Sequence, residues 1–154
     1  MVPSPLEAHQ RVSKKIEYQL VEFIEGHDLG YVYYAPFDVV LSMGNVVQPD
    51  ILFISKERRG IITKQNVQGA PDLVIEVLSP GTSDRDLTLK RTLYGKYGVR
   101  EYWIVNPEAQ TVEVCILGKS GLDTVRVYPK ESMLSSVILP GLEIDLREIF
   151  APLP

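Results

Sequence analysis

Glu76 is the first residue whose type and position suggest chemistry. It lies inside LVIEVL (73–78), a nearly continuous apolar run that is typical of a strand covered on both faces. Burying an ionised carboxylate costs free energy unless the group is paired, hydrogen-bonded or bound to a metal ion. Two interpretations stay open from the residues alone. Glu76 either forms an ion pair across the sheet or faces water on an edge strand, or it is a metal ligand.

A metal site needs a second ligand, and two aspartates that follow prolines are the candidates. Asp72 and Glu76 are four residues apart on one strand, roughly 13 Å, whereas oxygen ligands lie about 2.1 Å from a shared Mg²⁺. Asp72 is therefore expected to have a structural role at the start of its strand. Asp50 opens the run ILFIS on a different strand. Because paired strands are about 4.8 Å apart, Asp50 and Glu76 can converge if their strands are neighbours.

Lys90 is the third candidate, on a helix predicted over residues 84–97. With Leu87 at zero on a helical wheel of about 100° per residue, Tyr94 falls at about −20° and Lys90 at about −60°. Lys90 is therefore predicted beside the face that Leu87 and Tyr94 turn to the sheet. The alternatives are an ion pair with Asp86 four residues earlier, or an alkyl stem that packs along the surface.

Two carboxylates that converge on a hard divalent cation, with a lysine nearby, suit the hydrolysis of a phosphodiester. The cation lowers the pKa of a bound water and neutralises phosphate charge. The lysine can orient or activate the attacking water and can stabilise the developing negative charge. Composition and spacing make this chemistry possible, and the elements around the three residues decide whether they meet.

The chain reads as a mixed α/β protein in the order helix, three strands, helix, several strands. Apolar residues at helical spacing predict the first helix from Pro5 to about Glu25. His9 lies near that stripe, where packing or capping is a more common use of histidine than proton transfer. A hairpin is predicted from 31–42 with 46–55 around Met43-Gly44-Asn45, and further strands are predicted at 73–78, 101–105, 111–117 and 124–128. The second helix, 84–97, is expected to begin after a cap at Thr82 or Ser83 and to end at Gly98. The tail alternates between apolar and polar residues through 137–139 and 142–146.

Length and composition bound the class of protein. The 154 residues fit one domain, expected over residues 1–154, and the apolar share of 45% is ordinary for a globular chain. A net charge of −4 excludes a protein that coats nucleic acid by charge alone. The single cysteine excludes an internal disulfide. With no apolar run of about 18 residues and no signal-like core, a cytoplasmic protein is expected.

Two long segments carry a resemblance to a known family. VQPDILFIS (47–55) and the run from PDLVIEVLSPGTS to VNPE (71–108) closely resemble the Uma-type family of putative restriction endonucleases, long known as a domain of unknown function. The family belongs to the PD-(D/E)XK nuclease superfamily. EAHQRVSKKI (7–16) is similar to its first helix and ILPGLEIDLREIF (138–150) to its closing segment, so the resemblance covers nearly the whole chain.

The resemblance implies a restriction-endonuclease-like α/β core, in the order α-β-β-β-α-β, with additional C-terminal antiparallel strands. It implies that Asp50 is the aspartate of the PD pair and that Glu76 is the acidic residue of (D/E)XK. The lysine position of that motif holds Leu78, and the resemblance places the lysine at Lys90 on the following helix. It also makes the main-chain carbonyl of Val77 a further metal ligand, beside Asp50 and Glu76.

The function that the resemblance implies is an endodeoxyribonuclease dependent on Mg²⁺ or Mn²⁺, with DNA as its substrate. The alternative is a catalytically inactive module of the same fold that binds nucleic acid or a protein partner, and the acidic charge favours it. An acid on the first helix often completes such sites, and the choice among three residues stays open. Those three are Glu17, Glu22 and Glu25.

Two surfaces are candidates for contact with other molecules. Nucleases of this superfamily often act in pairs, so a homodimer is expected, and a group of aromatic residues could face the second copy. A polar loop after the Asp50 strand gathers cations that could meet phosphates, or it is simply solvated. The aromatic residues are Tyr31, Tyr33, Tyr34 and Phe37, and the loop cations are Lys56, Arg58, Arg59 and Lys64.

Overall fold

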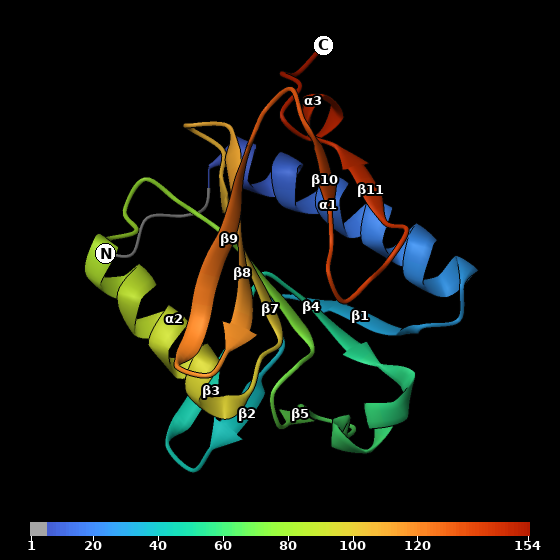
Figure 1. Cartoon of the computed structure of the whole chain (residues 1–154), viewed down its shortest axis with the longest axis vertical. Helices are drawn as coiled ribbons and strands as arrows, with labels where there is room; N and C mark the ends of the chain where they lie inside the picture. Colours follow the sequence, from blue (N-terminus) through green and yellow to red (C-terminus); the bar gives the residue numbers. More distant parts are fainter. Residues whose placement is uncertain (1–5) are drawn as a thin grey trace.

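A six-stranded mixed sheet forms the centre of the protein in a computed structural model that describes residues 6–154 (Figure 1). The strand order is β1-β4-β6-β7-β8-β9. β6 and β7 are parallel neighbours, and every other neighbouring pair in this sheet is antiparallel. The strands are β1 (Gly30–Tyr34), β4 (Ile51–Ser55), β6 (Leu73–Val77), β7 (Glu101–Asn106), β8 (Thr111–Gly118) and β9 (Gly121–Pro129).

Two long helices cover the opposite faces of this sheet. α1 (Glu7–Gly26) packs a stripe of apolar side chains on one face, and α2 (Asp84–Tyr97) packs on the other. Alternate residues of a strand point to opposite faces, and in β6 both sets are buried. The apolar character of β6 at almost every position follows from this double cover, as the sequence indicated. The predicted start of α1 at Pro5 lies outside the described residues.

The ends of α2 agree with the sequence prediction. The side-chain hydroxyl of Ser83 accepts a hydrogen bond from the N–H of Asp86 at 3.1 Å, so Ser83 rather than Thr82 is the N-cap. Gly98 ends the helix with a φ of 93°, a left-handed conformation in which glycine avoids the steric cost of a Cβ. These local signals fix where α2 begins and ends, and with them the position of Lys90 on its inner face.

The predicted hairpin of 31–42 with 46–55 is confirmed, but its two paired parts belong to different sheets. β1 pairs with β4, while β2 (Val39–Ser42) pairs with β3 (Asn45–Val47) in a separate small sheet that also contains β5 (Val67–Gln68). Prolines split both predicted strands because a proline has no N–H for the ladder: Pro36 separates β1 from β2, and Pro49 separates β3 from β4. The predicted turn at Met43-Gly44 is present, between β2 and β3.

β8 and β9 extend the sheet as the additional antiparallel strands that the sequence predicted. The polar loop after β4 contains a short helix, η1, and the tail forms a two-stranded sheet and a short helix. Of the alternating tail, residues 143–145 form a strand and residues 137–139 do not. The elements outside the main sheet are η1 (Lys56–Ile61), β10 (Met133–Ser135), β11 (Glu143–Asp145) and α3 (Leu146–Ile149).

Glu101 explains why residues 137–138 leave the strand conformation. Its carboxylate is fully buried and accepts hydrogen bonds from Trp103 Nε1 at 2.6 Å and Ser136 Oγ at 2.7 Å. The main-chain N–H groups of Val137 and Ile138 donate to the same carboxylate at 2.9 and 3.2 Å. One buried side chain therefore attaches the C-terminal segment to β7.

We expect Glu101→Ala to lower the free energy of unfolding by roughly 2–4 kcal/mol, because it leaves buried donors without an acceptor. Urea denaturation followed by circular dichroism measures this change. The control is Glu143→Ala, which removes an exposed carboxylate in β11. A loss for Glu101→Ala no larger than that of the control would contradict the attachment.

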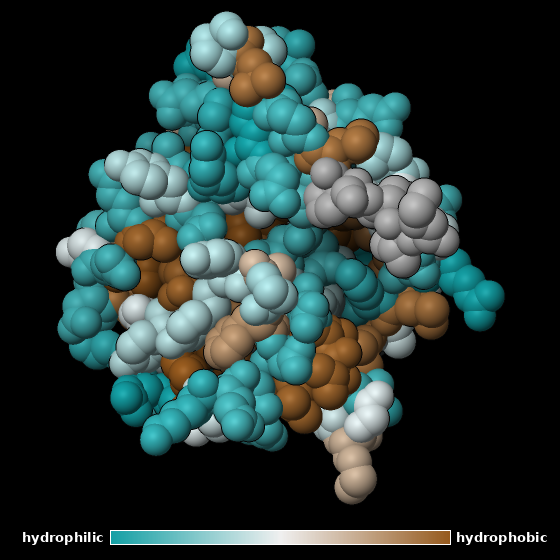
Figure 2. Space-filling view, turned by 180° about the vertical axis from the view of Figure 1, so that it is seen from behind, coloured by the Kyte–Doolittle hydropathy of each residue, from teal (hydrophilic) through white to brown (hydrophobic). Residues whose placement is uncertain are grey.

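Among residues 6–154, no helix is both long and apolar enough to cross a membrane. Hydrophilic residues dominate the face shown in Figure 2, and the hydrophobic residues on that face form separate patches. The cysteine at position 115 is buried and free, in agreement with the packing role that its position in an alternating strand predicts.

Candidate active site

Asp50 and the end of β6 meet at one edge of the sheet. Because β4 runs antiparallel to β6, the start of β4 lies beside the carboxyl end of β6. Asp50 directly precedes β4, and its Oδ2 accepts a hydrogen bond from the N–H of Val77 at 2.7 Å. The condition set by the sequence, that the strands of Asp50 and Glu76 be neighbours, is therefore met.

Glu76 is buried, with 5% of its surface exposed, on a strand between β4 and β7. The ammonium of Lys90 donates a hydrogen bond to its Oε2, and the hydroxyl of Tyr94 lies 3.5 Å from its Oε1. Burial raises the pKa of Glu76, while the charge of Lys90 acts in the opposite direction. The inward position of Lys90 is confirmed. The ion pair also matches the interpretation of Glu76 as a paired carboxylate, with the partner on a helix.

His9 lies at the same edge of the sheet. Its Nε2 is 3.3 Å from Asp50 Oδ1, and its Nδ1 is buried with no hydrogen-bond partner among the described residues. The hydrogen bond with Asp50 raises the pKa of His9 most, burial opposes the rise, and the Val77 carbonyl and the charge of Glu76 add to it. His9 does not cap α1, because Leu6 is the N-cap. Its side chain is largely buried and also contacts Asp50.

The oxygen atoms at this edge suit a hard divalent cation. Asp50 and Glu76 offer carboxylates and Val77 a main-chain carbonyl, the donor types that Mg²⁺ and Mn²⁺ prefer. The charge of Asp50 also raises the pKa of Glu76, and a bound cation would relieve this repulsion. Within residues 6–154, no three Asp, Glu, His or Cys side chains are grouped as ligands of one ion. Any cation at this edge would therefore have Asp50 and Glu76 as its carboxylates and the carbonyl of Val77 beside them.

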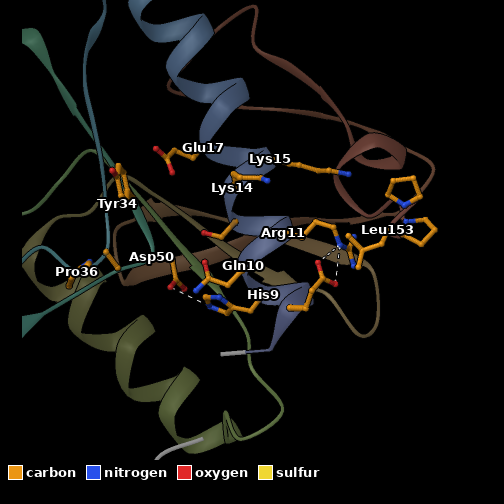
Figure 3. Close-up of a pocket in the computed structure, with 15 residues that line it drawn as sticks. His9, Gln10, Arg11, Lys14, Lys15, Glu17, Tyr34, Pro36, Asp50 and Leu153 are labelled. Atoms are coloured by element: carbon orange, nitrogen blue, oxygen red, sulfur yellow. Dashed lines mark hydrogen bonds and ion pairs between the residues drawn. The ribbon is translucent and has the colours of Figure 1, made fainter. Parts of the chain in front are cut away.

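A groove of about 950 Å³ opens beside Asp50 (Figure 3). Its walls are the outer side of α1, residues 34–36 after β1 and residues 152–154 at the C-terminal end. Of the three first-helix acids left open by the sequence, Glu17 lines this groove, and Glu22 and Glu25 do not. Burial raises the pKa of Glu17.

Asp72 lies at the opposite end of its strand and has structural partners. Its Oδ2 accepts a hydrogen bond from the N–H of Ser55 at 2.8 Å, and Arg58 and Arg100 approach its carboxylate at 3.3 and 3.6 Å. These contacts agree with the structural role predicted for it. They also occupy Arg58, one of the loop cations considered for phosphate contact.

Both the sequence and the fold of the chain are similar to those of known proteins. Over residues 1–147, the sequence matches the Uma2 family, described as putative restriction endonucleases. The chain belongs to the Uma2 family. No curated protein matches it. A solved structure of a putative nuclease belonging to DUF820, from Anabaena variabilis ATCC 29413, superposes with a TM-score of 0.80 at 19% identity, covering 97% of this chain and 83% of that one.

The structural match confirms the restriction-endonuclease-like α/β fold predicted from the sequence. In this Uma2 chain, the predicted core corresponds to α1, β1, β4, β6, α2 and β7. The family and the structural neighbour together point to a nuclease. Leu78 stands at the usual lysine position, and the lysine that reaches Glu76 comes from α2.

The ion pair between His9 and Asp50 predicts a pH-dependent stability for this Uma2 protein. The raised pKa means that the folded state binds the His9 proton more tightly than the unfolded chain does. The resulting stability is fully present below about pH 6.5 and is lost as the pH rises through the higher pKa of the folded state. We expect His9→Asn to lower the melting temperature more at about pH 5.5 than at about pH 9, in metal-free buffer. Equal losses at both pH values in thermal unfolding would contradict the ion pair.

Proposed function

We propose that the chain acts as one nuclease domain that hydrolyses DNA phosphodiester bonds with Mg²⁺ or Mn²⁺. Asp50, Glu76 and the carbonyl of Val77 would hold the ion, and Lys90 would act on the attacking water. One observation carries this proposal: two carboxylates on neighbouring strands meet at one edge of the sheet, and a lysine from α2 contacts one of them.

The residues of the chain have separate tasks in this proposal. When bound, the ion supplies Lewis-acid activation and neutralises phosphate charge. Asp50 is held in place through the N–H of Val77, so its other oxygen faces the groove side of the edge. Glu76 accepts a hydrogen bond from the ammonium of Lys90 and so holds it at this edge. From there, the ammonium can orient the attacking water and stabilise charge that develops on the phosphate.

Nicking of a supercoiled plasmid tests the proposed function directly. The wild-type protein is incubated with the plasmid in millimolar Mn²⁺, in millimolar Mg²⁺, or with EDTA, and the supercoiled, nicked and linear forms are separated on a gel. We expect nicking that depends on the metal and stops with EDTA. A folded protein that leaves the plasmid intact at millimolar Mn²⁺ and Mg²⁺ would overturn the proposal.

The inactive module remains the second candidate, and one contact favours it. The ion pair with Lys90 accounts for the buried carboxylate of Glu76 without any metal. Calorimetric titration with Mn²⁺ separates the two candidates. Metal binding together with nicking supports the nuclease, whereas DNA binding that needs no metal and produces no nicking supports the module.

A homodimer and a cytoplasmic location stay predictions. Of the four aromatic residues considered for a dimer contact, Tyr31, Tyr33 and Phe37 are partly buried, and the rings of Tyr33 and Phe37 pack at 4.9 Å. Tyr34 alone among the four is well exposed. Sedimentation equilibrium over a range of protein concentrations measures the oligomeric state.

A further inference from the structure

Three depressions form a continuous line along the outer side of α1. The groove beside Asp50 shares Lys14 and Lys15 with a depression of about 320 Å³ that Tyr18 also lines. In the other direction, it shares His9 with a depression of about 540 Å³ between α1 and the loop 78–82. The depressions therefore extend from the loop 78–82 past His9 and around the outer side of α1 to Tyr18. Tyr18 lies about 14 Å from His9 along the helix axis, at about 1.5 Å per residue, and on the opposite side of the helix.

The cations on this line keep their charge available. Lys14 is exposed and forms no ion pair within the part of the chain that the structure describes. Lys15 donates to the main-chain carbonyl of Glu148 at 3.0 Å, and a carbonyl does not neutralise an ammonium. Arg11 is paired with Glu7. Two lysines thus present positive charge beside the groove, whose lining also includes the carboxylates of Glu17 and Asp50 and the paired Glu7.

In the polar loop after β4, two of the four cations are engaged in ion pairs. Lys56 pairs with Asp28 at 2.8 Å, and Arg58 is bound to the buried Asp72. The loop also begins at the end of β4 opposite to Asp50, about 17 Å away along the strand. The cations of α1 line the same groove as Asp50, so they are the better candidates.

Two exposed tyrosines flank the lysines. Tyr18 is 70% exposed on α1 beyond Lys14, and Tyr34 is 61% exposed on the opposite wall of the groove (Figure 3). Exposed aromatic rings interleaved with cations are the arrangement that binds unpaired nucleic acid: the bases stack on the rings, and the phosphates contact the cations. In a duplex, the faces of the bases are already stacked on each other.

We propose that the groove along α1 binds a single-stranded segment of nucleic acid that leads to the Asp50–Glu76 edge. This inference rests on the proposed nuclease function and refines its substrate. Lys14 and Lys15 contact phosphates, and Tyr34 and Tyr18 stack with bases. The preferred substrate then carries an unpaired stretch next to the bond that is cut.

Fluorescence anisotropy tests this inference with labelled single-stranded, duplex and tailed-duplex oligonucleotides, in EDTA so that no cleavage occurs. We expect the wild type to bind the single-stranded and tailed forms more tightly than the duplex. The double variant Lys14→Ala/Lys15→Ala should bind single strands roughly tenfold more weakly, with the log–log salt slope reduced by about 1.4 for two lost phosphate contacts. Tyr34→Ala should weaken single-strand binding by about fivefold or more and leave duplex binding unchanged.

The matched control is Lys119→Ala/Lys130→Ala, which removes two exposed lysines near β8 and β9 and changes the net charge equally. The proposed single-strand groove would be overturned if the Lys14/Lys15 variant bound single strands as tightly as this control. It would also be overturned if the wild type bound single strands and duplex with equal affinity. If metal-dependent plasmid nicking persists in that case, the proposed nuclease stands without the groove. If single-strand binding depends on these residues and no nucleic acid is cleaved with metal, the groove stands and the nuclease fails.

Discussion

Glu76→Gln is expected to reduce metal-dependent plasmid nicking by about a thousandfold, since ligation of a catalytic cation contributes several kcal/mol to the transition state. Glutamine keeps the shape of the side chain. Its amide oxygen can accept the hydrogen bond from Lys90, and its NH2 group can donate to the hydroxyl oxygen of Tyr94. It removes the negative charge, and with it one of the two carboxylates that would hold the ion. Rates of nicking in Mn²⁺ for the wild type and the variant measure the effect.

Calorimetric titration with Mn²⁺ accompanies the rate measurement, so that lost chemistry is traced to lost binding. The matched control is Glu113→Gln. Glu113 is a half-buried carboxylate of the same sheet, and it pairs with Arg91 of α2 at 3.1 Å. We expect this control to bind Mn²⁺ and to cleave like the wild type. Full cleavage by Glu76→Gln, with circular dichroism unchanged, would remove Glu76 from the active site.

Asp50→Asn is the companion change on the neighbouring strand. The asparagine oxygen can still accept the hydrogen bond from the N–H of Val77 that fixes this residue at the edge of the sheet. The variant is therefore expected to stay folded and to lose nicking to a similar degree. Normal cleavage by both variants would show that the ion, if there is one, binds elsewhere.

The sequence predicted what depends on local chemistry. Helical spacing and end signals give α2 its boundaries, and the boundaries place Lys90 on the inner side of the helix. An acidic residue in an apolar run marks Glu76 as buried. The convergence of Asp50 with Glu76 could be predicted only conditionally, because it depends on which strands pair. The pairing is set by the long-range packing of β4 against β6.

His9 and Glu101 show why the rest could not be predicted. His9 follows the spacing of the apolar stripe of α1. That stripe can end over the core or over the edge of the sheet, depending on how far the helix extends past the strands. The spacing alone therefore does not predict which environment His9 has. The sequence did contain a signal that Glu101 is buried. Glu101 begins an apolar strand, just as Glu76 lies inside one. Its partners lie about 35 residues away in the chain, in a segment whose own pattern indicated a strand.

Lys90→Met is expected to reduce nicking by about a hundredfold to a thousandfold, because it removes the group that orients the attacking water and stabilises charge on the phosphate. Methionine keeps much of the side-chain length and loses the ammonium. Mn²⁺ binding should persist at neutral pH, which separates this variant from Glu76→Gln. Nicking rates and Mn²⁺ calorimetry on the same preparations measure both effects.

The pH dependence of Mn²⁺ binding gives Lys90→Met a second readout. The ammonium lowers the pKa of Glu76 against the larger effect of burial. Removal of the ammonium raises the pKa of Glu76 further, so Glu76 keeps its proton up to a higher pH. As the pH is lowered, Mn²⁺ binding by the variant should therefore begin to weaken at a higher pH than Mn²⁺ binding by the wild type. The control is Lys96→Met, an exposed lysine on the same helix. Its nicking rate and pH profile should match the wild type.

A stability measurement separates catalysis from structure in this variant. The Lys90 side chain is 45% exposed, so the loss of its ion pair should lower the free energy of unfolding by only about 1–3 kcal/mol. Such a loss leaves the domain folded, and slower nicking then reflects the chemistry. If Lys90→Met is destabilised to this extent and still nicks DNA at the wild-type rate, Lys90 serves only as the structural partner of a buried carboxylate. In that case, the activation of water must come from another group at the edge, and His9, already in contact with Asp50, becomes the residue to replace next.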